Sequence, residues 1–304
     1  MGARLKDHAP LVVDFADRLS LAKIPRISSM PLSARRSASP TRPVIRWAGS
    51  KRLLIPKLSR LAPESFDRYV EPFVGSACLF FALKPKTAVL SDLNAHLIGT
   101  YSEIRKNPDA VAEAMQEWRP TRDEYLKARA LKIVDDDTRA AARFLFLNRY
   151  SFNGVYRENQ SGEFNVPWGG GRSGNLPTVN ELRAVANALE SVTLVRSDFE
   201  SVAKPTRNGD FLYLDPPYHY GDGRNRGEYG YGAIAAADME RFVASVLVAH
   251  NRGVKILISY NKAHSLLRAL PHWKLHYSPV RRSVAGFCEK RRDVREYMLR
   301  NFES

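Results

Sequence analysis

Apolar residues along the chain gather in short runs that alternate with longer amphipathic stretches. Runs with the length and the β-branched or aromatic content of strands lie at 68–75 (with a closing turn), 87–94, 192–195, 211–214, 254–259, 273–280 and 294–299. Helical patterns follow the first run, as "CLFFAL" at 78–83, and separate the two runs at 211–214 and 254–259, at 237–251. Strands that alternate with helices predict an α/β fold around a largely parallel sheet, and the last two runs predict an antiparallel hairpin at its edge.

The stretch between the second and third strands is too long to be a simple connection. Residues 101–147 are rich in Ala, Glu and Arg and predict mostly helix, whereas 148–178 are rich in Asn, Gly and aromatic residues and predict a loop or hairpin. We therefore expect an inserted, mainly helical domain at 104–185. The main domain would comprise 43–103 and 186–304.

Residues 1–42 have the composition of an extension. From Arg18 to Arg42 the chain contains Arg, Ser and Pro but no Asp or Glu, which predicts a disordered basic tail. An Arg- and Ser-rich segment without acidic residues is also typical of a transit peptide. A start of translation upstream of the natural one at Met30 is a third interpretation.

The formal net charge of +15 favours a polyanionic partner, with nucleic acid first, over a merely soluble basic protein. The two cysteines, Cys78 and Cys288, give no disulfide framework and no cysteine zinc site, and they suit a reducing compartment. The histidines show no metal-ligand spacing, so no metal is expected. No apolar run reaches the length of a membrane span, so no membrane partner is expected either.

Three predicted strands end on acidic residues, Glu71, Asp92 and Asp215, and ligands of parallel sheets bind beyond these ends. An acid at the end of the second strand is typical of a residue that accepts hydrogen bonds from a ribose diol. The turn "EPFVGSA" has a single glycine and cannot approach a pyrophosphate closely. A nucleoside without phosphates, such as S-adenosylmethionine, fits better. The alternative is that Asp92 caps the following helix.

The segment "FLYLDPPYHY" at 211–220 joins a buried strand to a carboxylate and two prolines. The prolines fix φ and donate no N–H, so Asp215 and the carbonyl of Pro216 form a rigid pair of acceptors. Such acceptors suit the hydrogens of a planar amine, and the carboxylate would stabilise positive charge that develops on its nitrogen. Tyr218 offers a face on which a base can stack. An ordinary Asp-Pro-Pro turn is the alternative.

Six motifs in order resemble those of DNA adenine-N6 methyltransferases of the Dam type, the alpha-ordered D12 class. They are "IRWAGSKRLLIPKL" at 45–58, "YVEPFVGSACLFF" at 69–81, "SDLN" at 91–94, "FLFLNRYSFNGVYRENQSGEFNVPWG" at 144–169, "YLDPPY" at 213–218 and "VRRSVAGFCEKRRDVREYML" at 280–299. The resemblance covers the chain from about Pro43 to Phe302. It implies a Rossmann-like S-adenosylmethionine-dependent methyltransferase sheet, with the inserted domain at 104–185 as the target-recognition domain.

The resemblance also assigns roles to residues. Lys51 would pair with the carboxylate of the cofactor, beside Trp47, and Asp92 would hold the ribose. The implied cofactor-binding set is Trp47, Lys51, Phe73, Gly75, Asp92 and Asp215, and the implied catalytic set is Asp215, Pro216, Pro217 and Tyr218. No metal is implied.

The recognition block carries the implied DNA contacts. Phe152 would wedge into the base stack and Asn153 would meet the orphaned base. Arg157 would read the major-groove edge of a guanine, and Val155 and Pro167 would contact a thymine methyl group. The family's usual site, GATC, is the first expectation for the recognition sequence.

Some positions depart from the family's pattern. Ser50 replaces the second glycine of the first motif, and Ala77 and Cys78 replace the later glycine region of the cofactor turn with other small residues. These changes should tighten the turn without abolishing binding. After Trp168, "GGGRSGNLP" replaces basic and aromatic residues and weakens the GATC assignment.

Three further segments each have two interpretations. Residues 219–232 predict a lid over the base pocket or a plain surface loop. The aromatic residues of 150–168 could form a small core, in part through Phe164 and Trp168. The basic residues near the last hairpin turn indicate phosphate contact or a solvated charged loop; they are Arg281, Arg282, Lys290, Arg291 and Arg292.

Together these observations predict a site-specific methyltransferase that moves a methyl group from S-adenosylmethionine to adenine N6 in duplex DNA after base flipping. The alternatives are transfer to cytosine N4, RNA or a protein amide, or a DNA-binding relative without turnover. We expect a bacterial or phage-encoded protein of the cytoplasm, associated with the nucleoid, with a cognate restriction endonuclease as a further partner.

Overall fold

The computed structural model describes residues 41–131, 136–159, 161–170, 173–217, 236–261, 263–281 and 293–303. Its centre is a seven-stranded sheet with the order β3-β2-β1-β4-β5-β7-β6. The strands are β1 (Arg68–Glu71), β2 (Ala88–Asp92), β3 (Val192–Arg196), β4 (Asp210–Leu214), β5 (Lys255–Tyr260), β6 (Lys274–Arg281) and β7 (Asp293–Arg300). The first five are parallel, whereas β7 runs antiparallel to both β5 and β6.

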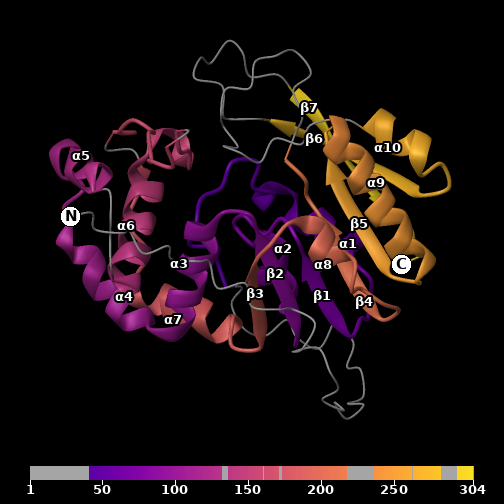
Figure 1. Ribbon diagram of the computed structural model, residues 1–304, viewed down its shortest axis with the longest axis horizontal. Helices are drawn as coiled ribbons and strands as arrows, with labels where there is room; N and C mark the ends of the chain where they lie inside the picture. Colours follow the sequence, from indigo (N-terminus) through magenta and orange to yellow (C-terminus); the bar gives the residue numbers. More distant parts are fainter. Residues whose placement is uncertain are drawn as a thin grey trace, which may run out of the picture.

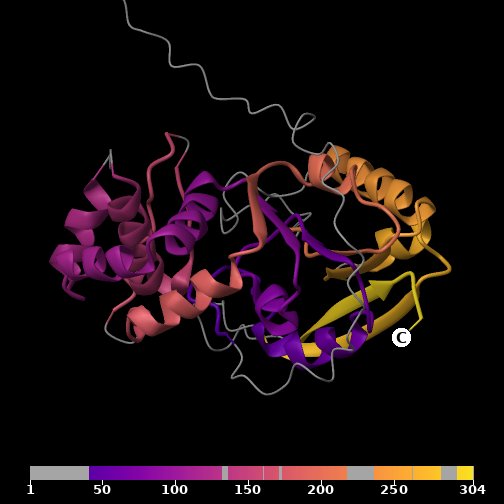
Figure 2. The ribbon, with the colours of Figure 1, turned by 90° about the horizontal axis from the view of Figure 1, so that it is seen from below.

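Helices cover both faces of this sheet and build a lobe beside β3 (Figures 1 and 2). The α-helices are α1 (Ile55–Leu61), α2 (Cys78–Leu83), α3 (Ala95–Lys106), α4 (Pro108–Ala114), α5 (Arg122–Ala130), α6 (Asp137–Tyr150), α7 (Val179–Ala188), α8 (Phe199–Ala203), α9 (Ala236–Asn251) and α10 (Ala263–Ala269). Three short 3₁₀ turns are η2 (Arg52–Leu54), η3 (Met115–Glu117) and η4 (Phe152–Gly154).

Side chains on the central strands alternate between the two faces of the sheet, and this divides the core into two layers. On β4, Phe211 and Tyr213 pack with α1, α2 and the helical lobe, while Leu212 and Leu214 pack with α8, α9 and α10. Successive side chains of a strand point to opposite faces, so a strand that is buried on both faces needs an unbroken apolar run. The run "FLYL" meets this need and holds the end of β4 rigidly in the middle of the sheet.

The lobe beside β3 contains α4, α5, α6 and α7, with α3 packed against α6 and α7 (Figure 1). Helices α5, α6 and α7 begin at side chains that accept backbone N–H groups, as Thr178 does with Glu181 in a capping box at α7. After α6 the chain forms a hairpin-like loop with antiparallel bridges between Ser151 and Trp168 and between Glu158 and Phe164.

The predicted fold class is confirmed: strands fall at all the expected runs, and the last two form an antiparallel hairpin at the sheet edge. The limits expected for the inserted domain, 104 and 185, fall inside α3 and α7, so the domain division stays a prediction. Within the described ranges, no helix combines the length and the apolar character that crossing a bilayer requires.

Candidate functional site

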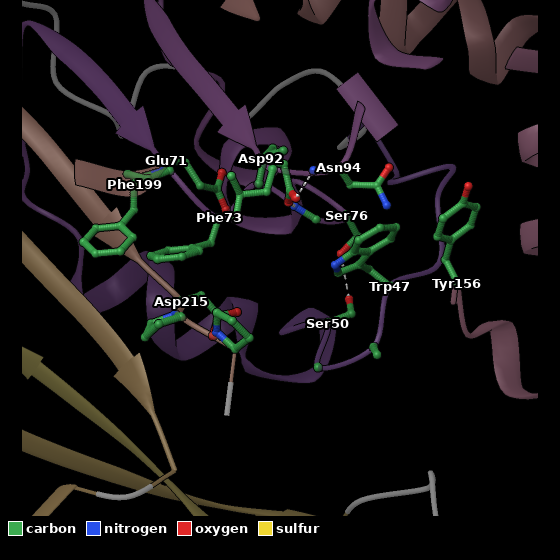
Figure 3. A pocket seen from close by; sticks show the side chains of 18 of the residues that line it. Trp47, Ser50, Glu71, Phe73, Ser76, Asp92, Asn94, Tyr156, Phe199 and Asp215 are labelled. Carbon is green, nitrogen blue, oxygen red and sulfur yellow. Dashed lines mark hydrogen bonds between the residues drawn. The ribbon is translucent and has the colours of Figure 1, made fainter. Parts of the chain in front are cut away.

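A cavity of about 640 Å³ opens at the carboxyl ends of β1, β2, β3 and β4 (Figure 3). It brings together most of the residues that sequence patterns single out for small-molecule binding. Trp47, Lys51, Phe73, Gly75, Asp92, Asp215, Pro216 and Pro217 all line it. The parallel strands explain this gathering, because their carboxyl ends meet at one edge of the sheet.

The turn after β1 needs glycine at position 75 for two reasons. Gly75 has φ of +43°, and a Cβ placed there would lie 2.6 Å from Cδ1 of Trp47. The single glycine of "EPFVG" therefore lets the indole close over the turn. Phe73, two residues earlier, stacks on Phe199, with ring centroids 5.6 Å apart and planes 26° from parallel.

Asp92 holds this turn from β2. Its Oδ2 accepts the backbone N–H of Gly75 at 3.2 Å, and its Oδ1 accepts that of Asn94 at 3.0 Å. Burial raises the pKa of Asp92, while these backbone donors lower it. The alternative that Asp92 caps the following helix is wrong, because the side chain of Asn94 is the cap of α3 and accepts the N–H of Leu97.

Asp215, at the end of β4, forms an ion pair with Lys51 from the loop before η2. The ammonium of Lys51 lies 2.6 Å and 2.8 Å from the two oxygens of Asp215 and donates to the carbonyl of Gly49 at 2.9 Å. Lys51 is only 6% exposed, so these contacts replace water around a buried charge. We expected its ammonium to face a cofactor carboxylate; here it faces Asp215.

Glu71, which the sequence marks only as an acidic strand end, lies buried in the same cavity. Tyr69 donates its hydroxyl to Oε2 of Glu71 at 3.0 Å. Burial raises the pKa of Glu71 well above its ordinary value, and repulsion from Asp215 and Asp92 acts in the same direction. The floor of the cavity is thus rich in carboxyl groups and suits a ligand that carries positive charge.

The departures from the family's glycine pattern meet in one small cluster. Ser76 donates its hydroxyl to Ser50 at 3.0 Å, and the thiol of Cys78 lies 3.2 Å from Ser50 and 3.3 Å from Ser76. Ala77, between them, has φ of +52°, a strained value for a residue with a Cβ. These contacts join the loop of Lys51 to the turn of Gly75, as a tighter turn requires.

The hairpin-like loop that follows α6 reaches the cavity through Tyr156, whose ring stacks on Trp47 at 5.9 Å with an interplanar angle of 17°. Phe152 is 47% exposed at the loop surface, and Asn153 beside it has φ of +56°. Arg157 donates from Nε to Asn165 at 2.7 Å. Val155 is half-buried and Pro167 is exposed.

The small core expected within this loop is confirmed in part. Phe164 is 6% exposed and packs in the main core, and Trp168 packs against the same core. Phe152, Asn153 and Pro167 are exposed, so the loop combines a side that packs on the core with a side that faces solvent.

Sequence reasoning missed the acidic turn after β3. Asp198 and Phe199 line the cavity, and Arg241 on α9 donates to Asp198 at 2.9 Å and to Glu200 at 2.6 Å. The signal was present as "VRSDF", a predicted strand followed by an acid and an aromatic residue. It repeats the pattern of the other strand ends and could have been found with the same rule.

Several expectations fall on residues outside the described ranges. They are the extension through residue 40, Tyr218, the segment 219–232, and Arg282, Lys290, Arg291 and Arg292 of the last hairpin turn; the side chain of Arg281 is not described either. Among the described residues, no group of three or more His, Cys, Asp and Glu is arranged to hold a metal ion.

Comparison with known proteins gives consistent matches. The model of the family described as D12 class N6 adenine-specific DNA methyltransferase matches residues 47–284. A type II methyltransferase of Lactococcus lactis subsp. cremoris, M1.LlaDCHI, is 28% identical over 86% of this chain and 95% of its own length.

Two further relatives carry adenine-methylation names. The DNA N-6-adenine-methyltransferase of Escherichia phage P1 is 33% identical over 76% of this chain and 31% of its own length. The DNA adenine methylase of Haemophilus influenzae is 28% identical over 84% of this chain and 92% of its own length. The region that the family model matches, residues 47–284, contains both the cavity and the hairpin-like loop that follows α6.

Proposed function

Because this chain belongs to the D12 class of N6 adenine-specific DNA methyltransferases, we propose that it transfers a methyl group from S-adenosylmethionine to adenine N6 in duplex DNA, after flipping the base. The observation that carries this proposal is the position of Asp215. Its carboxylate lines the cavity directly after the buried strand β4, and Pro216 and Pro217 follow it.

The residues of the cavity fit S-adenosylmethionine, a nucleoside that carries a sulfonium and an amino-acid group. The buried carboxyl of Glu71 and the carboxylate of Asp215 suit its positive charges, and Lys51 lies beside them to meet its carboxylate. Asp92 would accept the hydrogens of the ribose diol. The volume of about 640 Å³ is within the range of small-molecule sites.

We propose that the neighbouring turn after β3 binds the adenine of the cofactor. The stacked rings of Phe73 and Phe199 offer an aromatic wall, and Asp198 offers a carboxylate beside it. A carboxylate can accept the exocyclic amino hydrogens of adenine, while an aromatic face contacts its ring. We therefore add Asp198 and Phe199 to the proposed cofactor-binding residues.

Asp215 and the carbonyl of Pro216 would accept the two hydrogens of the target amine. Two acceptors draw the nitrogen away from planarity and return its lone pair from the ring, which makes the amine a better nucleophile. S-adenosylmethionine supplies the methyl group. The carboxylate of Asp215 then stabilises the positive charge that develops on the amine, and Tyr218 is proposed to stack on the flipped base.

On the DNA side, the exposed Phe152 would fill the gap that the flipped adenine leaves, and Asn153 would contact the orphaned base. The left-handed backbone of Asn153 turns the loop tip so that both side chains are exposed. Val155 and Pro167 would contact a thymine methyl group. The net charge of +15 supports attraction to the phosphates.

The family description narrows the range of substrates. Transfer to cytosine N4, RNA or a protein amide, and DNA binding without turnover, were open on sequence grounds. The match to an N6 adenine-specific class favours adenine in DNA, and Lys51, Asp92 and Asp215 occupy one cavity as turnover requires. GATC remains our first proposal for the site.

Two biological settings follow as proposals. The type II name of the Lactococcus relative is a name for restriction-modification systems, so a cognate restriction endonuclease is one proposed partner. The relatives are bacterial, archaeal and phage proteins, and we propose that this chain acts on DNA in the cytoplasm, at the nucleoid.

Expression in a host without DNA methyltransferases tests the activity. Plasmid DNA from such cells, read by long-read sequencing, should contain N6-methyladenine in one sequence context. Absence of N6-methyladenine from DNA that was exposed to the folded protein would overturn the proposed function. Methylation in a context other than GATC would overturn only the proposed site.

Arg157→Ala should weaken the choice of one guanine. A guanidinium that reads O6 and N7 together contributes about 1–3 kcal/mol of discrimination, so methylation at sites with the wrong base should rise by roughly 10–100-fold relative to the correct site. The measurement is the ratio of methylation rates on duplexes that differ at one position. S-adenosylmethionine affinity should not change; a parallel loss of that affinity would contradict the assigned role.

A further inference from the structure

Glu296 of β7 is buried next to the ion pair of Lys51 and Asp215. It lies in the last of the six motifs, at 280–299, but the resemblance assigns it no cofactor-binding or catalytic role. It is 2% exposed, and Ser259 of β5 donates its hydroxyl to Oε1 of Glu296 at 3.0 Å. The same Oε1 lies 3.6 Å from the ammonium of Lys51. The antiparallel strand thus brings a second carboxylate to the cation that binds Asp215.

The ammonium of Lys51 is therefore shared. Both oxygens of Asp215 lie within 2.8 Å of it, and Glu296 approaches it at 3.6 Å. The pKa of the Tyr213 hydroxyl shows that the same carboxylates lie close together. Burial is the largest cause that raises this pKa, and Asp215, Glu71 and Glu296 raise it further. Glu296 acts on the same small region as the catalytic carboxylate.

This arrangement bears on how Asp215 works. A carboxylate with both oxygens close to one ammonium is a weaker acceptor for the hydrogens of an amine. When Asp215 turns an oxygen toward the target amine, the buried ammonium of Lys51 loses one of its closest acceptors and keeps the carbonyl of Gly49. A second carboxylate at the ammonium offsets that loss and keeps the site negative where positive charge develops.

We propose that Glu296 is a positioning residue for methyl transfer: it holds the ammonium of Lys51 so that Asp215 can accept the hydrogens of the target adenine. This inference rests on the proposed function. It assigns to the C-terminal hairpin a part in catalysis that its place at the edge of the sheet does not by itself suggest.

The test compares charge with shape at position 296. Glu296→Gln keeps the shape and removes the charge, whereas Glu296→Asp keeps the charge and shortens the side chain. Glu303→Gln is the matched control, since Glu303 also pairs with a lysine, Lys274, but is 78% exposed and outside the cavity. Single-turnover transfer of labelled methyl groups to plasmid DNA from a methylation-free host gives the rate, and equilibrium dialysis gives the S-adenosylmethionine Kd.

We expect Glu296→Gln to slow single-turnover transfer at least about tenfold while the Kd for S-adenosylmethionine changes less than about threefold. The reason is that a shifted Lys51 ammonium weakens Asp215 as an acceptor mainly in the transition state, where positive charge develops on the amine. Glu296→Asp should be faster than Glu296→Gln, and Glu303→Gln should match the wild type. A rate for Glu296→Gln within threefold of the wild type would overturn the inference. So would an aspartate variant that is slower than the glutamine variant, since shape would then outweigh charge.

Ser259→Ala covers the case in which Glu296→Gln does not fold, as judged by its melting temperature. It removes the donor to Glu296 and leaves every charge in place, so it should slow transfer with an unchanged Kd. If Ser259→Ala then transfers at the wild-type rate, the inference is wrong. A wild-type protein that methylates nothing refutes the proposed function itself, and that outcome is recognised before any variant is compared.

Discussion

Asp215→Asn will slow methyl transfer to adenine by on the order of 10³-fold, with the affinity for S-adenosylmethionine nearly unchanged. The substitution keeps the size and the rigid backbone of the Asp-Pro-Pro turn. It removes the negative charge that faces the developing positive charge on the amine, and it replaces one acceptor with a donor. Both changes act on the transition state more than on the bound cofactor.

The measurement is a single-turnover rate with saturating cofactor and unmethylated plasmid DNA. The Kd and the melting temperature of the variant serve as its controls, because Lys51 loses its closest carboxylate and keeps Glu296 at 3.6 Å. A rate within tenfold of the wild type would remove Asp215 from its central role. A Kd that weakens as much as the rate would instead make it a binding residue.

Asp92→Asn is expected to weaken S-adenosylmethionine binding by about 10–100-fold, as a hydrogen bond to a charged acceptor contributes about 1.5–3 kcal/mol. In the structure the carboxylate of Asp92 is oriented by the N–H groups of Gly75 and Asn94. Those two donors hold it at the carboxyl end of β2, where a ribose diol can donate to it. The rate of transfer at saturating cofactor should change far less than the Kd.

A cofactor analogue without ribose hydroxyls provides the control for this prediction. The wild type should bind the analogue about as weakly as Asp92→Asn binds S-adenosylmethionine, and the variant should distinguish the two ligands by less than threefold. If the variant still prefers S-adenosylmethionine strongly, the hydroxyls are bound elsewhere. A large fall in melting temperature without ligand would show that Asp92 mainly supports the turn of Gly75.

The contact between the turn of Gly75 and the loop after α6 would link the proposed cofactor site to the proposed DNA contacts. Trp47 covers Gly75 on one side and stacks on Tyr156 on the other, and Arg157 follows Tyr156 directly. Figure 3 shows Trp47 and Tyr156 next to each other in the lining of the cavity. Arg157, the side chain proposed to read DNA, thus itself lines the cavity that is proposed to bind the cofactor.

Local patterns were sufficient for the elements of the fold and for the rigid parts of the site. The run "FLYL" predicted a strand buried on both faces, and the two prolines after Asp215 predicted a fixed turn, because both effects act within a few residues. The run at 68–75 predicted a strand with a closing turn, and the structure gives Gly75 in that turn φ of +43°. The order of the motifs predicted that the proposed recognition block is inserted between the cofactor motifs and the catalytic motif.

The sequence by itself determined the strands, the parallel sheet and the set of acidic strand ends, since hydrophobic periodicity and proline geometry are local properties. Only the tertiary structure decided the partners. Lys51 pairs with Asp215 across 164 positions, and Glu296 joins them from an antiparallel strand. Local sequence patterns do not predict which carboxylate a buried lysine pairs with, because the pairing depends on which strand ends the sheet order brings together.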